Sequence, residues 1–335
     1  RLGAGGMGVV FLARQESLQR DEAQRMFEDA REVFRRVGSF ENITLADLEL
    51  DFAVALLGQT RYDEAERILR EVEAEPGWRE RASAVDRIAW NTNMGTLHRS
   101  RGELDQAEID FARALEIARS AFGEVHNEVA RTLQNMAVLY IERGRHEAAL
   151  PLLTEALDVR ARLGAGESME DARAEFNLAS ACGKLHRLDE SARHFGRALE
   201  LCRKLAGDSP QTAKAAMGMG SAYFKLGDYG KAEAILREAL DLSRRLVPHR
   251  GLAGAEAPLW LARCLVKLRC GVEAVPLFEE VVECVRADPA VSPEVHAKFE
   301  GELGALLLDL GRPGEAQPHL DHQKELLEPA DDAGH

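Results

Sequence analysis

Apolar and polar positions repeat along this chain with a nearly constant period. Each repeat contains an amphipathic segment, such as YDEAERILREV or LDQAEIDFARAL, in which a small residue marks the same place in the pattern. These anchor residues are Ala65, Ala107, Ala149, Ser191, Ala232, Ala274 and Ala316. Successive anchors lie 42 residues apart, with one step of 41 between Ser191 and Ala232, and Ala23 lies another 42 residues upstream. A register kept over seven units predicts an array of structural repeats.

The pattern around each anchor predicts two helices per unit. A large apolar residue follows the anchor by four positions, at Leu69, Phe111, Leu153, Phe195, Leu236, Phe278 and Leu320. In four units a small residue follows three positions later, at Ala114, Ala156, Ala198 and Ala239. Spacings of four and three place these side chains on one helical face. Five residues before the anchor stands a turn glycine (Gly102, Gly144, Gly227, Gly311), which Thr60, His186 and Arg269 replace in three units. We therefore expect an all-α fold with no sheet beyond a short hairpin at residues 1–14.

The order of these residues resembles a known family. A glycine, an aromatic residue or leucine two positions later, an alanine three further on and a large apolar residue four beyond that resemble the tetratricopeptide repeat (TPR). The 42-residue period, seen in AFGEVHNEVARTLQNMAVLYIERGRHEAALPLLTEAL, is similar to the long-helix TPR subtype of kinesin light chain, over roughly residues 13–328. The resemblance implies helical hairpins stacked into a right-handed superhelix, an α-solenoid, whose first helices line a concave groove. It also implies a leading half-repeat at 15–40, seven units at 41–328 and a disordered tail at 329–335.

Within that resemblance, one stripe of each first helix faces the groove. Its members lie 18, 14, 11 and 7 residues before the anchor, and the second place holds Asp51, Asn93, Asn135, Asn177, Gly218, Trp260 and Glu302. TPR domains commonly use asparagine at this place to bind an extended peptide, because a carboxamide both donates and accepts hydrogen bonds. Asn93, Asn135 and Asn177 are therefore candidate peptide contacts. The alternative, which stays open, is that they are consensus residues facing water.

Charge adds a ligand preference to this picture. The chain has a formal net charge of −14, which argues against a nucleic-acid partner. The predicted stripe nevertheless carries Arg173, Lys184, Lys214, Lys225, Arg263 and Lys267 beside Trp260, and with Lys298 it holds five of the eight lysines. A field of one sign in a concave site concentrates ligands of the other sign, so we expect an acidic peptide or protein segment. A solvated face of mixed charge is the alternative.

Residues 1–14, RLGAGGMGVVFLAR, carry a different signal. Gly3, Gly5, Gly8 and Val10 resemble the glycine-rich loop of bacterial eukaryotic-like Ser/Thr protein kinases, in which backbone amides close over nucleotide phosphates. A kinase also needs a strand lysine, H-R-D and D-F-G, whereas the first lysine of this chain is Lys184. We interpret the loop as a remnant that binds nothing. A second interpretation is that GVVFLARQES serves as the first helix of the leading half-repeat.

Other candidate chemistry is sparse. The five cysteines form no C-x-x-C pair and are expected to be reduced and packed. His319 and His322 have a spacing compatible with a metal on one helix face, but no third ligand with defined spacing accompanies them, so neither a metal site nor a cofactor is predicted. No signal peptide or membrane-spanning stretch is visible, and we expect a cytoplasmic protein. The sequence begins at Arg1 without a methionine, so we expect the native start to lie upstream.

Together these features predict a non-catalytic scaffold or adaptor that binds an extended acidic peptide. The rival hypothesis is the TPR-containing portion of a bacterial Ser/Thr protein kinase whose catalytic core is missing or truncated. A third is self-association through the ends of the solenoid. The partner, the oligomeric state and the pathway are not specified by the sequence.

The interpretation of the glycine-rich loop generates the first testable prediction. The protein should neither bind ATP nor transfer a phosphoryl group, because transition-state charge would meet no lysine, catalytic base or metal ligand. Isothermal titration with Mg-ATP measures this. Micromolar affinity that is lost on replacing Gly5 and Gly8 would contradict the prediction.

Overall fold

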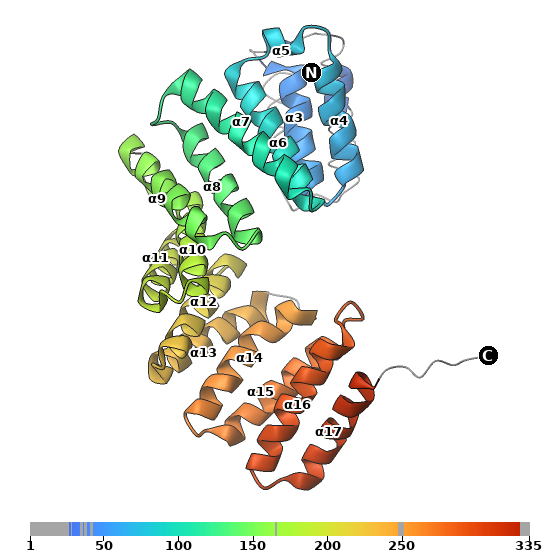
Figure 1. The fold of residues 1–335 in the computed structure, drawn as a ribbon, viewed down its shortest axis with the longest axis vertical. Coiled ribbons are helices and arrows are strands. Elements are labelled where there is room, and N and C mark those ends of the chain that lie inside the picture. The colour runs from blue at the N-terminus through green and yellow to red at the C-terminus, as the bar shows by residue number, and fades with distance from the viewer. Residues whose placement is uncertain are drawn as a thin grey trace, which may run out of the picture. The chain divides into compact units, whose positions relative to one another are not determined.

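The computed structural model describes residues 43–164, 166–246 and 251–328, together with 27, 29–33, 36 and 39–40. The glycine-rich loop with Gly3, Gly5, Gly8 and Val10, most of the expected half-repeat at 15–40 and the tail at 329–335 lie outside the described residues. The described chain is overwhelmingly helical, which confirms the all-α fold class (Figure 1). It divides into two compact units, residues 1–165 and 166–335, each of which is considered by itself.

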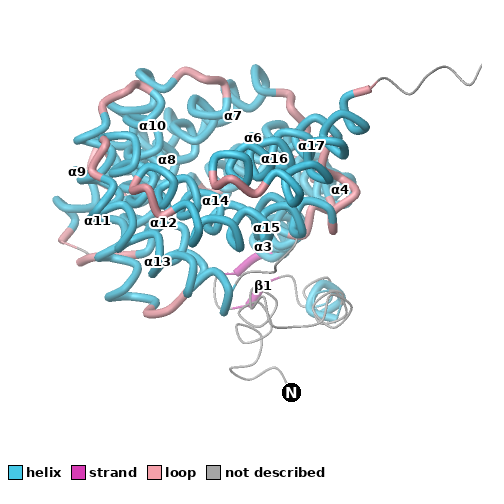
Figure 2. The backbone as a smooth tube through the Cα atoms, turned by 90° about the horizontal axis from the view of Figure 1, so that it is seen from below, coloured by secondary structure: helices cyan, strands magenta, loops and turns pink. Residues whose placement is uncertain are grey.

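Consecutive helices form antiparallel pairs within each unit. The first unit contains α3 (Leu45–Gly58), α4 (Tyr62–Ala74), α5 (Trp78–Arg81), α6 (Ala84–Ser100), α7 (Leu104–Phe122), α8 (Asn127–Glu142) and α9 (His146–Leu163). The second contains α10 (Met169–Lys184), α11 (Leu188–Ala206), α12 (Pro210–Leu226), α13 (Tyr229–Leu246), α14 (Gly251–Lys267), α15 (Gly271–Arg286), α16 (Pro293–Asp309) and α17 (Pro313–Leu327). Among the described helices, seven pairs run from α3/α4 to α16/α17, and short turns join their members (Figure 2). The extra turn α5 was not predicted.

A small hairpin precedes the first pair. Strands β1 (Ser39–Phe40) and β2 (Ile43–Thr44) pair antiparallel, whereas sheet was expected nowhere beyond residues 1–14. The extended backbone at Thr44 has a local cause, because this residue caps α3. Its hydroxyl accepts from the Asp47 amide while its own amide donates to the Asp47 carboxylate at 2.7 Å, which forms a capping box. The chain must therefore enter α3 extended.

The turn inside each pair uses left-handed backbone, as the repeated glycine predicts. Gly102, Gly144, Gly227 and Gly311 have φ values between 71° and 83°, and their replacements Thr60, His186 and Arg269 have φ values of 61°, 59° and 62°. A side chain in this conformation costs about 1–2 kcal/mol. The units that lack the turn glycine therefore keep the same turn geometry.

A small residue twelve positions before the anchor sets how closely the two helices of a pair approach. The residues at this place are Ala53, Gly95, Ala137, Ala179, Gly220, Ala262 and Gly304, and all are buried. A Cβ added to Gly95 would lie 2.8 Å from the Phe111 ring, and one added to Gly220 would lie 2.6 Å from Leu236. The facing residue is the large apolar one four positions after the anchor, which alternates between leucine and phenylalanine from unit to unit. A small residue of the first helix against a large apolar residue of the second helix is therefore the contact that recurs within the pairs.

Four of the five thiols are buried as predicted, and two tryptophans pack against each other. Cys182, Cys202, Cys264 and Cys284 are buried and all five cysteines are free; burial raises the pKa of Cys264 to about 11. Trp78 and Trp90 are buried with ring centroids 6.1 Å apart. The Trp90 indole N–H donates to the carbonyl oxygen of Leu69 at 2.9 Å, which satisfies its one polar atom.

The small-against-large contact generates the second prediction. Gly95→Ala should lower the free energy of unfolding by about 1–2 kcal/mol, because overpacking against the buried Phe111 ring outweighs the roughly 1 kcal/mol that alanine adds to helix propensity. Adding Phe111→Leu should reduce this cost, because the ring that approaches the new Cβ is replaced by a smaller side chain. Chemical denaturation of the single and double variants measures the coupling.

Gly230→Ala is the matched control for that series. Gly230 lies in α13, and a Cβ placed there meets nothing within 4 Å. Its replacement should leave stability unchanged or slightly higher. Equal losses for Gly95→Ala and Gly230→Ala would show that close approach is not what requires glycine at residue 95.

Candidate functional site

The predicted basic residues of the second unit lie on three first helices. The set Arg173, Lys184, Lys214, Lys225, Arg263 and Lys267, on α10, α12 and α14, is called the basic face below. Lys184, Lys225 and Lys267 occupy the equivalent last-turn position of their helices, where the partial negative charge of the helix end favours a cation. Their side chains and that of Lys214 are exposed. None of these four lysines forms an ion pair with a carboxylate among the residues that the structure describes.

Aromatic side chains connect the helices of the basic face. The Lys214 ammonium lies 5.4 Å from the centroid of the Phe176 ring, which joins α12 to α10. The Lys225 ammonium lies 5.8 Å from the centroid of Trp260, which joins α12 to α14. The Phe224 and Trp260 rings meet edge to face at 5.6 Å. Cation–π contacts of this length orient a lysine without neutralising it, so the positive charge stays available to a ligand.

The two arginines of the basic face are less available to a ligand than its lysines, because both pair with carboxylates of the chain. Arg263 makes hydrogen bonds of 3.0 and 2.5 Å to the carboxylate of Glu302 on α16, and Arg173 donates to Glu170 at 2.6 Å. Beside Arg263 lies a hollow of about 300 Å³, lined among others by Phe224, Val266, Lys267, Phe278 and Glu302. Both apolar and charged side chains line this hollow, and one of them, Lys267, belongs to the basic face.

The second helices of this unit differ in their electrostatics. Seven basic side chains of α11 and α13 form ion pairs, namely Arg197, Arg203, Lys204, Lys231, Arg237, Arg244 and Arg245. Several of these pairs connect neighbouring second helices, for example Arg203 with Glu238 and Arg237 with Glu273. Most basic side chains of α11 and α13 are therefore paired with carboxylates, whereas the four lysines of the basic face form no ion pair within the described chain.

The three candidate asparagines have different environments. Asn93 on α6 is buried, and its Nδ2 donates to the carbonyl oxygen of Leu50 on α3 at 3.0 Å. Asn135 on α8 and Asn177 on α10 are half-buried and make no hydrogen bond within the described chain. The amide of Asn93 thus joins two first helices, whereas those of Asn135 and Asn177 keep their hydrogen-bonding capacity.

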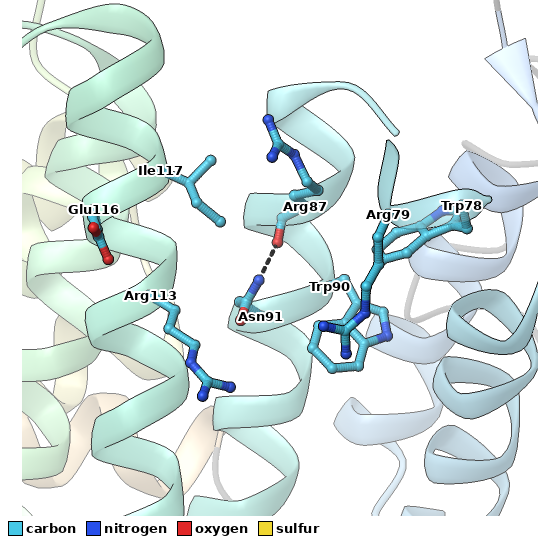
Figure 3. A pocket seen from close by; sticks show the side chains of 8 residues that line it. All are labelled: Trp78, Arg79, Arg87, Trp90, Asn91, Arg113, Glu116 and Ile117. Atoms are coloured by element: carbon cyan, nitrogen blue, oxygen red, sulfur yellow. Dashed lines mark hydrogen bonds between the residues drawn. The ribbon is translucent and has the colours of Figure 1, made fainter. Parts of the chain in front are cut away.

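The first unit contains a second candidate site that sequence reasoning missed. Arg79 of α5, Arg87 of α6 and Arg113 of α7 border a hollow of about 320 Å³ together with Trp78 and Trp90 (Figure 3). Arg79 pairs with Glu73, while neither Arg87 nor Arg113 has a carboxylate within ion-pair distance among the described residues. The Asn91 amide donates to the Arg87 carbonyl oxygen at 2.7 Å. These arginines come from three elements, so no local spacing could have indicated their meeting.

Sequence reasoning also missed the aromatic part of the basic face. Phe176 and Phe224 lie one residue before a predicted stripe position, at Asn177 and Lys225. An aromatic residue next to a stripe position could have indicated this contact. In the structure, for example, the ring of Phe176 on α10 lies near Lys214 on the following first helix. Trp260 was on the predicted stripe, and the structure brings Lys225 and Arg263 to its ring.

Comparison with known proteins identifies the repeats. Models of the tetratricopeptide repeat match residues 86–162 and 170–245, and a further one matches 301–322. The chain is 21% identical over 318 residues to Protein KINESIN LIGHT CHAIN-RELATED 2 of Arabidopsis thaliana. That alignment covers 94% of this chain and 47% of the relative, so the chain spans about half the length of the curated relative.

Solved structures share the fold at low identity. The apo form of the quorum sensor NprR from B. thuringiensis superposes with a TM-score of 0.65 at 15% identity and covers 97% of both chains. A Rap protein complexed with Competence and Sporulation Factor gives a TM-score of 0.59 at 14% identity, again over 97% of both chains. These likenesses establish the fold alone.

Among the described helices, none is both long and apolar enough to cross a membrane.

The different environments of the asparagines generate the third prediction. Asn93→Ala should lower the free energy of unfolding by about 1 kcal/mol, because it removes a buried hydrogen bond between α6 and α3. Asn177→Ala should leave stability nearly unchanged, since that amide has no partner to lose within the described residues. Urea denaturation of both variants tests this. Equal losses would contradict the assignment of a structural role to Asn93 alone.

Proposed function

Because this chain is a tetratricopeptide-repeat protein, we propose that it is a non-catalytic scaffold that binds an extended acidic segment of a partner along its basic face. One observation carries the proposal: four lysines that form no ion pair within the described chain stand on three successive first helices, which aromatic contacts join. Uncompensated charge of one sign over a hollowed surface raises the local concentration of the opposite charge. An acidic segment is the ligand that this surface would attract.

The polar and aromatic groups give the ligand a pose. The carboxamide of Asn177 would bind the ligand backbone beside these lysines, because an amide matches both its N–H and its C=O groups. Asn135 of the first unit would bind peptide backbone within that unit in the same way. Acidic side chains would meet Lys184, Lys225 and Lys267. Each such exposed charge contact contributes about 1 kcal/mol or less, so the affinity is modest and falls with salt.

Trp260 is the expected anchor of the complex. Its ring is half-buried, contacts Phe224 edge to face and has cations near it from two helices. Tryptophan is enriched among the residues that dominate binding energies, because a rigid ring contributes a large contact area at small entropic cost. The adjoining hollow of about 300 Å³ would take an apolar side chain of the ligand. The favoured segment is therefore acidic with an apolar residue among its charges.

Two structural neighbours are in keeping with a binding role. One is a Rap protein in complex with Competence and Sporulation Factor, and the other is the quorum sensor NprR. The rival from another class is the repeat-containing part of a bacterial Ser/Thr kinase, and the residues RLGAGGMGVVFLAR are the observation that favours it. An intact kinase reading frame upstream of Arg1 in the gene would support that rival. We place the protein in the bacterial cytoplasm on the same resemblance and on its free thiols.

Charge reversal on the basic face is the fourth prediction. The triple variant Lys184→Glu, Lys225→Glu, Lys267→Glu should weaken binding of short Glu- and Asp-rich peptides by at least about tenfold at low salt, and much less at high salt. The double variant Asn135→Ala, Asn177→Ala should weaken binding at every salt concentration, because an amide contact carries no net charge. Fluorescence anisotropy with labelled peptides measures both effects.

The second helices provide the matched control. Lys204 and Lys231 carry the same charge but pair with Glu167 and Asp228. Reversing both should change peptide affinity little, although the net charge changes by a similar amount. Preferential binding of Lys- and Arg-rich peptides, or equal losses in the two sets of variants, would refute the proposed site.

A further inference from the structure

Four side chains converge on one buried carboxylate at the last helix pair. Glu300 of α16 is fully buried. Its Oε1 lies 2.8 Å from Nδ1 of His322, 3.0 Å from an Nη2 of Arg286 and 3.3 Å from Nε2 of His296. Its Oε2 lies 2.7 Å from Nδ1 of His319. The groups come from α15, α16 and α17, and three of the four are imidazoles.

Hydrogen bonding within this cluster is incomplete. The single atom Oε1 faces three nitrogen atoms, and the buried Nε2 of His296 has no hydrogen-bond partner in the described structure. A buried imidazole nitrogen without a partner costs about 1–3 kcal/mol. Arg286 and His319 are therefore well placed by hydrogen bonds to Glu300, whereas Nε2 of His296 faces Oε1 without a well-directed hydrogen bond. A group that accepts electron pairs from several of these atoms together would account for it.

Neutral imidazole and carboxylate are the forms in which these side chains bind metals. Coordination through Nδ1 of His322 therefore displaces any proton that this nitrogen shares with Oε1 of Glu300.

We propose that His296, Glu300 and His322 bind a divalent transition metal ion of the zinc class. Their ligand atoms lie within 4.8 Å of one another. Tetrahedral zinc with bonds of about 2.0–2.1 Å separates its ligand atoms by about 3.3–3.4 Å. The 3.3 Å between Oε1 and Nε2 of His296 matches that edge, and the other side chains need only small adjustments. Two nitrogen ligands and one oxygen ligand favour zinc over magnesium or calcium, which prefer oxygen.

Arg286 and His319 would then act in the second coordination shell. His319 already donates to Oε2, the oxygen that does not face His296, and so orients the carboxylate. Arg286 donates to Oε1 and competes with the ion for that oxygen. Binding therefore requires the guanidinium to shift toward Oε2 or solvent, which its partly exposed side chain permits. The fourth coordination position stays open to water.

The location gives the ion a structural role. The helix α17 is the last helix of the described chain, and Ala316 is its one buried residue there. Two ligands come from α16 and one from α17, so a bound ion would link the two helices directly. Metal binding that requires the folded arrangement stabilises it by mass action. This site is independent of the basic face and of any peptide.

The fifth prediction tests the site with ZnCl₂ and the full chain, after removal of any affinity tag. Isothermal titration should show one high-affinity equivalent of Zn²⁺, and zinc should raise the melting temperature while MgCl₂ does not. His296→Gln and His322→Gln should each weaken zinc binding by about tenfold or more. Both side chains are partly exposed, so the variants are expected to fold, which circular dichroism checks.

Two further variants separate a metal site from a network of ion pairs. His194→Gln is the matched control, because His194 Nδ1 lies 2.6 Å from Glu175 but the two belong to no cluster of three metal-ligating side chains among the described residues, so it should leave zinc affinity unchanged. Arg286→Gln should strengthen zinc binding, since it removes the cation that competes for Oε1. Absence of zinc binding to the full chain, or binding that His296→Gln and His322→Gln leave intact, would overturn the proposal.

Discussion

The contact between a small residue of the first helix and a large apolar residue of the second helix determines the geometry of every pair. At Gly95, Gly220 and Gly304 the facing side chain lies too close for a Cβ to be added without movement. This contact fixes one side of the first helix against its partner. The remaining surface of that helix is then free to carry polar and aromatic residues, which is where the basic face and the candidate asparagines lie.

Charge follows the same division between first and second helices. Basic residues of α11 and α13 lie within reach of carboxylates on neighbouring helices and pair with them. Lys214 and Lys225 instead lie over aromatic rings of the adjoining first helices. Surface ion pairs contribute little to stability, but they remove charge from the surface. The uneven pairing therefore leaves lysines on α10, α12 and α14 of the second unit unpaired among the described residues, although the net charge of the chain is negative.

Repetition is the reason that so much of the fold could be predicted from sequence. The anchor register gave the helix pairs, and the turn position kept its left-handed backbone even at Thr60, His186 and Arg269. Features that break the repeat could not be predicted in this way, such as α5 with the buried Trp78. Contacts between residues of separate helices could not be predicted from sequence spacing either. The spacing of His319 and His322 was noted, but Glu300 and His296 approach them only through the packing of α16 on α17. Asn93 was grouped with Asn135 and Asn177, although burial commits its amide to Leu50.

The alternation of leucine and phenylalanine after the anchors has a consequence for folding errors. Repeat proteins risk pairing a helix with its counterpart in the wrong unit, because the interfaces resemble one another. Here a first helix that docks one unit out of register meets a large side chain of the other size, so Gly95 of α6 against a leucine, for example, would leave a void. A slip of two units restores the size but closes a loop about twice as long, at an extra entropic cost of about 0.6 kcal/mol. We expect the alternation to disfavour some of these one-unit slips relative to the native pairing.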